Sequence, residues 1–167
     1  GVIIDLRERL EALRHAHPED IRDESVRELQ SRFGVATDQA LRVRTLAQAL
    51  HDAVAGDADL ESRRELGWAC DLHEVGQMVS HHDHHRHSAY LLGNVDAAGF
   101  SQSQQRRVSD LVLGQRGGLR KLNGALDNRH FAWQTLCLRL AVIKCHARAA
   151  INSSALKLAR EAVGHLN

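Results

Sequence analysis

Residues 72–92 read LHEVGQMVSHHDHHRHSAYLL, and this stretch decides the fold. It holds six of the twelve histidines and opens with His73 and Glu74 inside an apolar helical run. A His followed directly by an acid is how a helical phosphohydrolase would begin a metal site. Neighbouring helical residues point about 100° apart, so the two can share one ion only if other helices bring further ligands. The alternative for the pair is a core His beside an acid that forms a salt bridge.

The run that follows is polar and charged, and residues 80–85 are predicted to form a loop. Its imidazoles suit zinc or nickel ions, which such clusters bind adventitiously. A solvated loop explains the same composition. A third interpretation is an anion site, because several imidazoles near their usual pKa, together with Arg86, give a pH-dependent positive patch. The histidines concerned are His81, His82, His84, His85 and His87.

A second basic group flanks the glycine-rich residues 115–124, which we expect to be irregular. Arginine forks and flexible backbone N–H groups together suit phosphate. The alternative is a basic surface loop without a ligand. The residues concerned are Arg106, Arg107, Arg116, Arg120 and Lys121.

Working outward, the chain predicts helix after helix. Its 167 residues, of which 43% are hydrophobic, fit one domain with a real core, and it contains a single proline. Gly34 stands where a left-handed residue would end a helix, and Ser101 where a cap would start one. Apolar residues at helical spacing occur over residues 3–16, 21–33, 40–54, 66–76, 86–95, 101–112 and 131–150.

The last two segments carry different expectations. The long apolar helix over 131–150 is predicted to turn one row of side chains inward. Residues 155–167 are ambiguous, because their alternating leucines permit a strand while their alanine and leucine content permits a helix. The inward row is Leu136, Leu140, Ile143 and Ala147.

Composition excludes several classes of protein. A net charge near +1 gives no sign of a nucleic-acid partner. Cys70, Cys137 and Cys145 form no CxxC pair, which favours buried thiols and a reducing, cytoplasmic location. We expect no membrane span and no signal peptide, because no apolar run approaches the required length.

The segment LHEVGQMVSHHDHHRHSAYLLGNVDAAGFSQSQQ resembles the C-terminal region of the exopolyphosphatase/guanosine pentaphosphate phosphatase family, with its LHE-(I/V)-G, SH, HSAYL, N-x-D and GFS motifs. The opening GVIIDL is similar to the family's GVxxD segment. The resemblance implies an all-α, HD-domain-like bundle of six to eight helices over residues 1–152. It also implies the start of a small C-terminal element, a truncated β-hairpin, over residues 153–167.

The same resemblance bears on metal chemistry. Enzymes of the HD fold use a lone His, a His-Asp pair and a late Asp, and the matching residues here are Gln39, His73, Glu74 and Val142. That set is too poor in ligands for a catalytic ion. We therefore expect no catalytic residue and no metal in this chain, with His73 and Glu74 as a structural remnant. Hydrolysis and magnesium are expected in N-terminal actin-like domains that lie outside this chain.

The resemblance implies that this region grips polyphosphate and forms a homodimer, in an enzyme that releases orthophosphate from polyphosphate ends and acts in addition on guanosine pentaphosphate. Two departures stand against it, since Gln115 replaces a basic residue and Asp83 adds an acid. The alternatives are a metal-dependent HD phosphohydrolase acting on nucleotides and a non-catalytic dimerisation or sensory module. The expected phosphate contacts are Arg86, Arg116, Arg120, Lys121, His81, His85 and His87.

Overall fold

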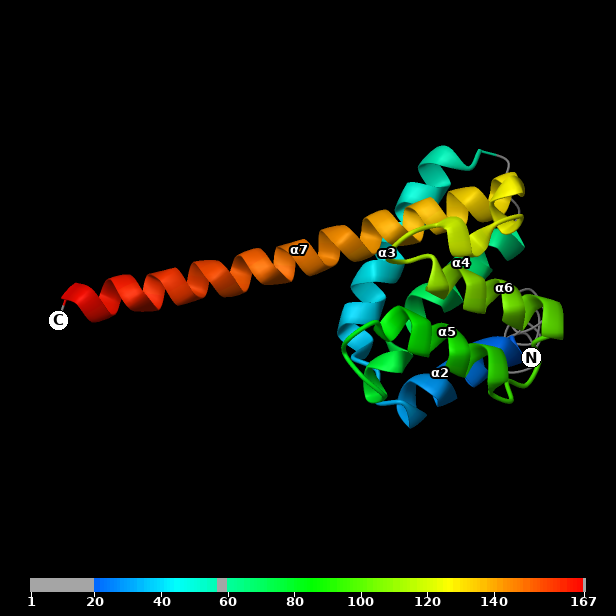
Figure 1. Ribbon diagram of the computed structural model, residues 1–167, viewed down its shortest axis with the longest axis horizontal. Helices are drawn as coiled ribbons and strands as arrows, with labels where there is room; N and C mark the ends of the chain where they lie inside the picture. Colours follow the sequence, from blue (N-terminus) through cyan, green and yellow to red (C-terminus); the bar gives the residue numbers. More distant parts are fainter. Residues whose placement is uncertain (1–19, 57–59, 167) are drawn as a thin grey trace, which may run out of the picture.

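The chain folds into a bundle of antiparallel and crossing helices (Figure 1). The computed structural model describes residues 20–56 and 60–166, and that part of the chain contains helices and no strand, as predicted. The helix expected over residues 3–16 lies outside the described residues. The elements are α2 (Ile21–Arg32), α3 (Thr37–Val54), α4 (Leu60–Leu72), α5 (His84–Asn94), α6 (Gln102–Leu113) and α7 (Arg129–Leu166), with 3-10 turns η1 (Val75–Met78), η2 (Arg120–Leu122) and η3 (Ala125–Asp127).

Local side chains explain where the helices begin and end. The Asp20 carboxylate accepts a hydrogen bond from the backbone N–H of Arg22 at 2.9 Å and so caps α2. Ser101 and Gln104 form a reciprocal capping box at the start of α6. Gly34 follows α2 with φ +63, the left-handed conformation predicted for it. These signals fix the element order before any long-range packing is considered.

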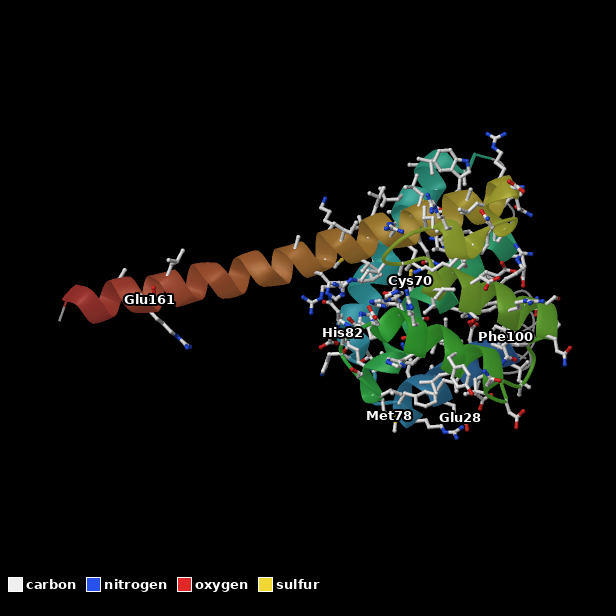
Figure 2. The ribbon with its side chains drawn as sticks, viewed as in Figure 1. Glu28, Cys70, Met78, His82, Phe100 and Glu161 are labelled. Atoms are coloured by element: carbon white, nitrogen blue, oxygen red, sulfur yellow. The ribbon has the colours of Figure 1, made fainter. Side chains whose placement is uncertain are left out.

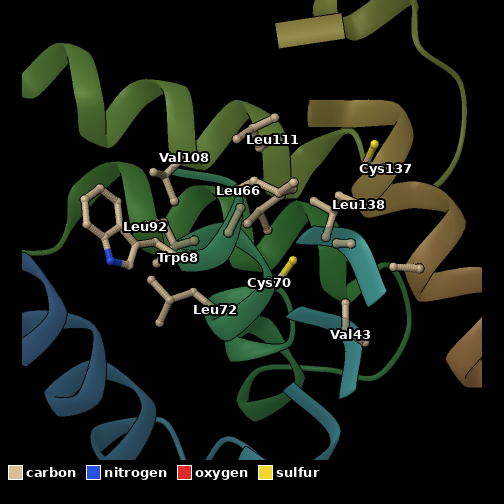
Figure 3. Close-up of a cluster of buried hydrophobic side chains, with 14 of the residues drawn as sticks. Val43, Leu66, Trp68, Cys70, Leu72, Leu92, Val108, Leu111, Cys137 and Leu138 are labelled. Carbon is tan, nitrogen blue, oxygen red and sulfur yellow. The ribbon is translucent and has the colours of Figure 1, made fainter. Parts of the chain in front are cut away.

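Helix α4 forms the centre of the bundle. It contacts α2, α3, α6 and α7, and every residue from Glu65 to Leu72 is buried. Most of this segment is apolar, and its two buried acids have basic partners, since Glu65 pairs with Arg107 and Asp71 with Arg44. Figure 3 shows Leu66 and Cys70 of α4 between Leu111 of α6 and Leu138 of α7. The predicted thiol burial holds for Cys70 and Cys137, whereas Cys145 is half-buried.

The prediction for the inner face of α7 is wrong. Leu136, Leu140 and Ile143 are 44%, 46% and 57% exposed, and Ala147 is exposed as well. The buried face carries two polar side chains whose groups are bonded: Gln134 donates to the Ser62 carbonyl at 2.7 Å and Thr135 to its own helix. Because hydrogen bonding makes polar burial acceptable, the face that carries Gln134 and Thr135 beside apolar residues lies inside. The row of Leu136, Leu140 and Ile143 lies outside. The inner face consists of Phe131, Gln134, Thr135, Cys137, Leu138 and Ala141.

The expected C-terminal hairpin is also wrong over the residues that the structure describes. Helix α7 continues without a break through residue 152 to Leu166 and extends beyond the bundle (Figure 1). A two-stranded hairpin needs a third strand or a packed face to be stable, whereas a helix satisfies its own backbone. Helix-forming residues dominate this segment, so the helical alternative prevails. Across the described ranges, no helix has the length and apolar content needed to cross a bilayer.

Candidate functional site

His73 lies directly after α4, and its side chain is fully buried. Its Nδ1 is 2.6 Å from the carbonyl oxygen of Cys70. A carbonyl oxygen only accepts, so Nδ1 carries the proton and Nε2 presents a lone pair. Burial lowers the pKa of His73 and outweighs the opposing effect of Glu74, so the ring is neutral near pH 7. Within the described part of the chain, Nε2 has no hydrogen-bond partner.

Two further atoms that could bind a metal ion, one from Glu74 and one from His146, lie near this lone pair. Glu74 Oε1 lies 3.6 Å from His73 Nε2, and His146 Nε2 on α7 lies 3.4 Å from the same oxygen. One donor atom of each residue lies within 4.8 Å of the other two. Burial by itself would raise the pKa of Glu74, but the hydrogen bond from His146 holds it below the usual value. We call His73, Glu74 and His146 the His-Glu-His cluster.

The backbone of this turn is held by α5 and by the loop after α6. The Gly76 N–H donates to Ser88 Oγ at 2.8 Å, and the Ser88 hydroxyl donates to the carbonyl of His73 at 3.2 Å. The Gln115 amide donates to the same carbonyl at 2.8 Å. Gln115 takes the place of the expected basic residue. Because Gln115 is buried and uncharged, it anchors the turn without bringing a charge into the interior.

The predicted loop over residues 80–85 is too long at its C-terminal end. Helix α5 begins at His84, and both His84 and His85 are buried. Asp83 takes up the change in direction with φ +52, a conformation that Asp tolerates better than most residues. Burial lowers the pKa of His84, the charge of Glu74 raises it, and the charges of His146 and Arg116 lower it further. His84 is therefore within electrostatic reach of the His-Glu-His cluster and of Arg116.

Basic side chains converge on the loop that follows α6. Lys121 Nζ donates to the carbonyl of Arg116 at 2.8 Å, and Arg139 donates to the carbonyl of Gly117 at 2.5 Å. Burial lowers the pKa of Lys121, and the charges of Arg86 and Arg139 lower it further. We call Arg86, Lys121, Arg139 and His85 the basic cluster.

His85 belongs to the basic cluster because of its surroundings. Burial, followed by the charge of Lys121, lowers its pKa to about 4, with Arg86 adding to the effect and Asp83 opposing it. A Cβ placed on Gly117 would lie 3.4 Å from Lys121 Nζ and 3.7 Å from His85 Nε2. These are ordinary contacts, so it is the left-handed φ of +78 that favours glycine here, in a loop that lies beside Lys121 and His85.

The chain matches a known protein family. A family model described as Ppx/GppA phosphatase, domain III, matches residues 21–166. The chain belongs to this family. The match runs from the first residue of α2 to the last residue of α7, so it includes the His-Glu-His cluster and the basic cluster alike. The resemblance seen in the sequence is confirmed.

Some of the expected phosphate contacts of this Ppx/GppA domain are brought together and others are not. Lys121, His85 and Arg139 all approach Gly117, and the charge of Arg86 acts on Lys121 and His85. Arg139 was not among the residues expected from the sequence. Arg116 and His81 are exposed, and the charges of both act on His84. The structure shows no shared contact for the other two expected residues, which are Arg120, exposed, and His87, half-buried.

The remaining residues of the two basic groups lie apart from these clusters. Arg107 pairs with the buried Glu65 at 3.1 Å. Arg106 lines a hollow with Gly93, at the opposite end of α5 from Arg86. His82 lies at the margin of the bundle, 92% exposed, with its ring 3.5 Å from Asp83 (Figure 2). The carboxylate that Asp83 adds to this loop thus lies close to the imidazole of His82.

His146 is not among the positions that the sequence matched to the HD metal ligands. Gln39 and Val142, the positions matched to HD ligands, are both half-buried, and Val142 packs against the apolar core. His146 follows Val142 by four residues, so it lies one turn further along the same face of α7. A search for His one turn on either side of the missing acid would have found it.

Proposed function

We propose that this Ppx/GppA domain grips polyphosphate through the basic cluster. The observation that carries the proposal is that the side chains of Lys121 and Arg139 both bond to the loop at residues 116–117, where His85 also lies close to Gly117. The charges of Arg86 and Arg139 lower the pKa of Lys121, and a bound phosphate would reverse that effect, because an anion favours the protonated amine. Arginine adds a bidentate geometry that matches phosphate oxygens. The first turn of α5 lies beside the cluster, and its helix dipole adds to the positive field.

The parent enzyme, in this proposal, releases orthophosphate from polyphosphate ends, and guanosine pentaphosphate is a second substrate to be tested. Hydrolysis and the magnesium ion belong to other domains of that enzyme. The purified chain should therefore release no orthophosphate from polyphosphate. Release that persists after contaminants are removed would favour the metal-dependent phosphohydrolase alternative, with nucleotides as the substrates to test next.

A salt-dependent titration tests the grip. Polyphosphates of several lengths would be titrated into the chain and into Arg86→Ala and Arg139→Ala variants. Each variant should bind more weakly, and the slope of log affinity against log salt should fall by about one for each phosphate contact removed. Arg106→Ala is the matched control, because Arg106 lies at the far end of α5. Equal affinity in all four proteins would sink the proposal and favour the sensory-module alternative.

We also propose that α7 mediates a homodimer. Its outer face exposes Leu136, Leu140 and Ile143 at a spacing of four and three residues, which places them in one stripe. A stripe of this kind is self-complementary in a two-fold pair. Light scattering should give a dimer mass for the chain and a monomer mass for Leu140→Glu. Tyr90→Glu, at an exposed residue of α5, is the control that should stay dimeric. A monomer at all concentrations of the unchanged chain would contradict the idea.

A further inference from the structure

We propose that the His-Glu-His cluster, His73, Glu74 and His146, is a binding site for one divalent transition-metal ion of the zinc class. The proposal goes beyond polyphosphate binding and differs from the expectation drawn from the sequence, which gave this chain no metal. It rests on the geometry of three side chains that the fold brings together from two separate segments.

The donor set suits such an ion. Two imidazole nitrogens and one carboxylate oxygen are typical ligands of zinc and of its first-row neighbours. Donors bound tetrahedrally to one zinc ion lie about 3.4 Å apart, given bond lengths near 2.1 Å. The carboxylate oxygen of Glu74 lies 3.6 Å from His73 Nε2 and 3.4 Å from His146 Nε2. The side chains therefore already stand close to the spacing that an ion would require.

His73 is prepared for coordination. Its Nδ1–H donates to the Cys70 carbonyl, which fixes the tautomer and aims the Nε2 lone pair at the cluster. Metal-bound histidines generally hold their second nitrogen in this way. Nε2 is buried, and no hydrogen-bond partner for it occurs among the described residues. A buried polar atom in that condition carries a cost unless a ligand satisfies it.

Hydrogen bonding within the protein does not remove this cost. Nε2 of His73 is an acceptor and so is the ionised carboxylate of Glu74, so two acceptors face each other at 3.6 Å. A proton on Nε2 would not solve the conflict, because the 3.6 Å between the two atoms is too long for a hydrogen bond. A proton on His146 satisfies Glu74 and leaves His73 without a partner. A cation between all three satisfies them together.

The position of the cluster lets an ion enter from the surface, and it determines which segments of the fold the ion would connect. The His146 side chain is 43% exposed, so an ion can reach the buried His73 from the surface and keep an open position there. Bound at this point, the ion would join the segment after α4 to α7. Helix α7 extends beyond the bundle (Figure 1), so an ion bound to His146 would hold that helix to the turn after α4.

The test uses the 167-residue chain without a histidine tag. Zinc affinity would be measured by competition with a chelating dye, and cobalt would report tetrahedral geometry by its visible absorption. We expect one equivalent to bind. His146→Ala and Glu74→Gln should each weaken binding at least tenfold, the lower bound for disturbing even an outer-shell partner of a metal site. His146 is the decisive variant, because its exposed side chain can be removed with the fold intact, as circular dichroism would verify.

The control addresses the exposed histidines of the neighbouring loop. The double variant His81→Ala, His82→Ala should keep the affinity and the cobalt spectrum of the unchanged chain. Zinc should raise the melting temperature of the unchanged chain and of this control, and should not raise that of His146→Ala. Affinity that is equal in His146→Ala and the unchanged chain, or that disappears in the loop variant alone, would overturn the proposal and assign the binding to the loop.

Discussion

Replacing Gly76 with alanine should destabilise the domain severely, because the turn after α4 leaves no room for a methyl group. An added Cβ would lie 2.3 Å from the His84 carbonyl oxygen and 2.3 Å from the Ser88 backbone nitrogen. Ordinary contacts begin at 3.4 Å, so the first turn of α5 would have to move by about 1 Å. That movement strains the packing, which costs about 1–3 kcal/mol. It also breaks the two hydrogen bonds that Ser88 makes with the turn, at about 1 kcal/mol each.

The expected loss is therefore about 3–5 kcal/mol in the free energy of unfolding. Urea denaturation followed by far-UV circular dichroism would measure it. Gly118→Ala is the matched control, because a Cβ there meets nothing within 4 Å and the backbone is not left-handed. The control should change stability by less than about 0.5 kcal/mol. A loss below about 1 kcal/mol in Gly76→Ala, or one equal to the control, would refute the reasoning about this turn.

Three further outcomes can be checked by the same denaturation assay. His85 has a folded-state pKa of about 4, below its unfolded value, so its stabilisation is complete above pH 6.5 and is lost as pH falls toward 4. Between pH 7 and pH 5, His85→Gln should lose roughly 1–2 kcal/mol less stability than the unchanged chain, and an identical pH dependence would contradict this. Leu138→Ala should cost about 2–5 kcal/mol and more than Leu140→Ala, because only Leu138 is buried within the bundle; the reverse order would restore the inward face expected from the sequence. Ser101→Ala removes the cap of α6 and should cost about 1 kcal/mol, whereas no loss would mean that Gln104 holds the helix start without it.

Local signals account for the parts of the fold that the sequence predicts well. Ser101 and Gly34 act through bonds and dihedral angles within a few residues of themselves, so their roles are readable before folding. The core residues of α4 follow from its apolar run over residues 66–70, whereas the burial of Glu65 and Asp71 depends on basic partners elsewhere in the chain. The family motifs between residues 72 and 101 add the all-α class and the family itself, which the family match confirms.

The errors share a physical cause, which is dependence on distant partners. Leu140 and Leu138 both fit a helical stripe, and the choice between the two stripes depends on Gln134 finding the carbonyl of Ser62. His146 meets Glu74 only after α7 packs beside the end of α4, so the contact itself is long-range, and the only sign of it along the chain is the one-turn spacing from Val142. His84 looked like part of a polar loop, and it is buried because the helix begins two residues earlier than predicted from the composition.

The length of α7 gives the domain a lever. Its 38 residues extend about 57 Å, and the 20 residues after His146 account for about 30 Å of that. A tilt of about 5° at the root would move the tip by about 2.6 Å, close to an atomic diameter. Rearrangements too small to alter the packing of the bundle would thus be amplified into displacements that a distant surface can sense.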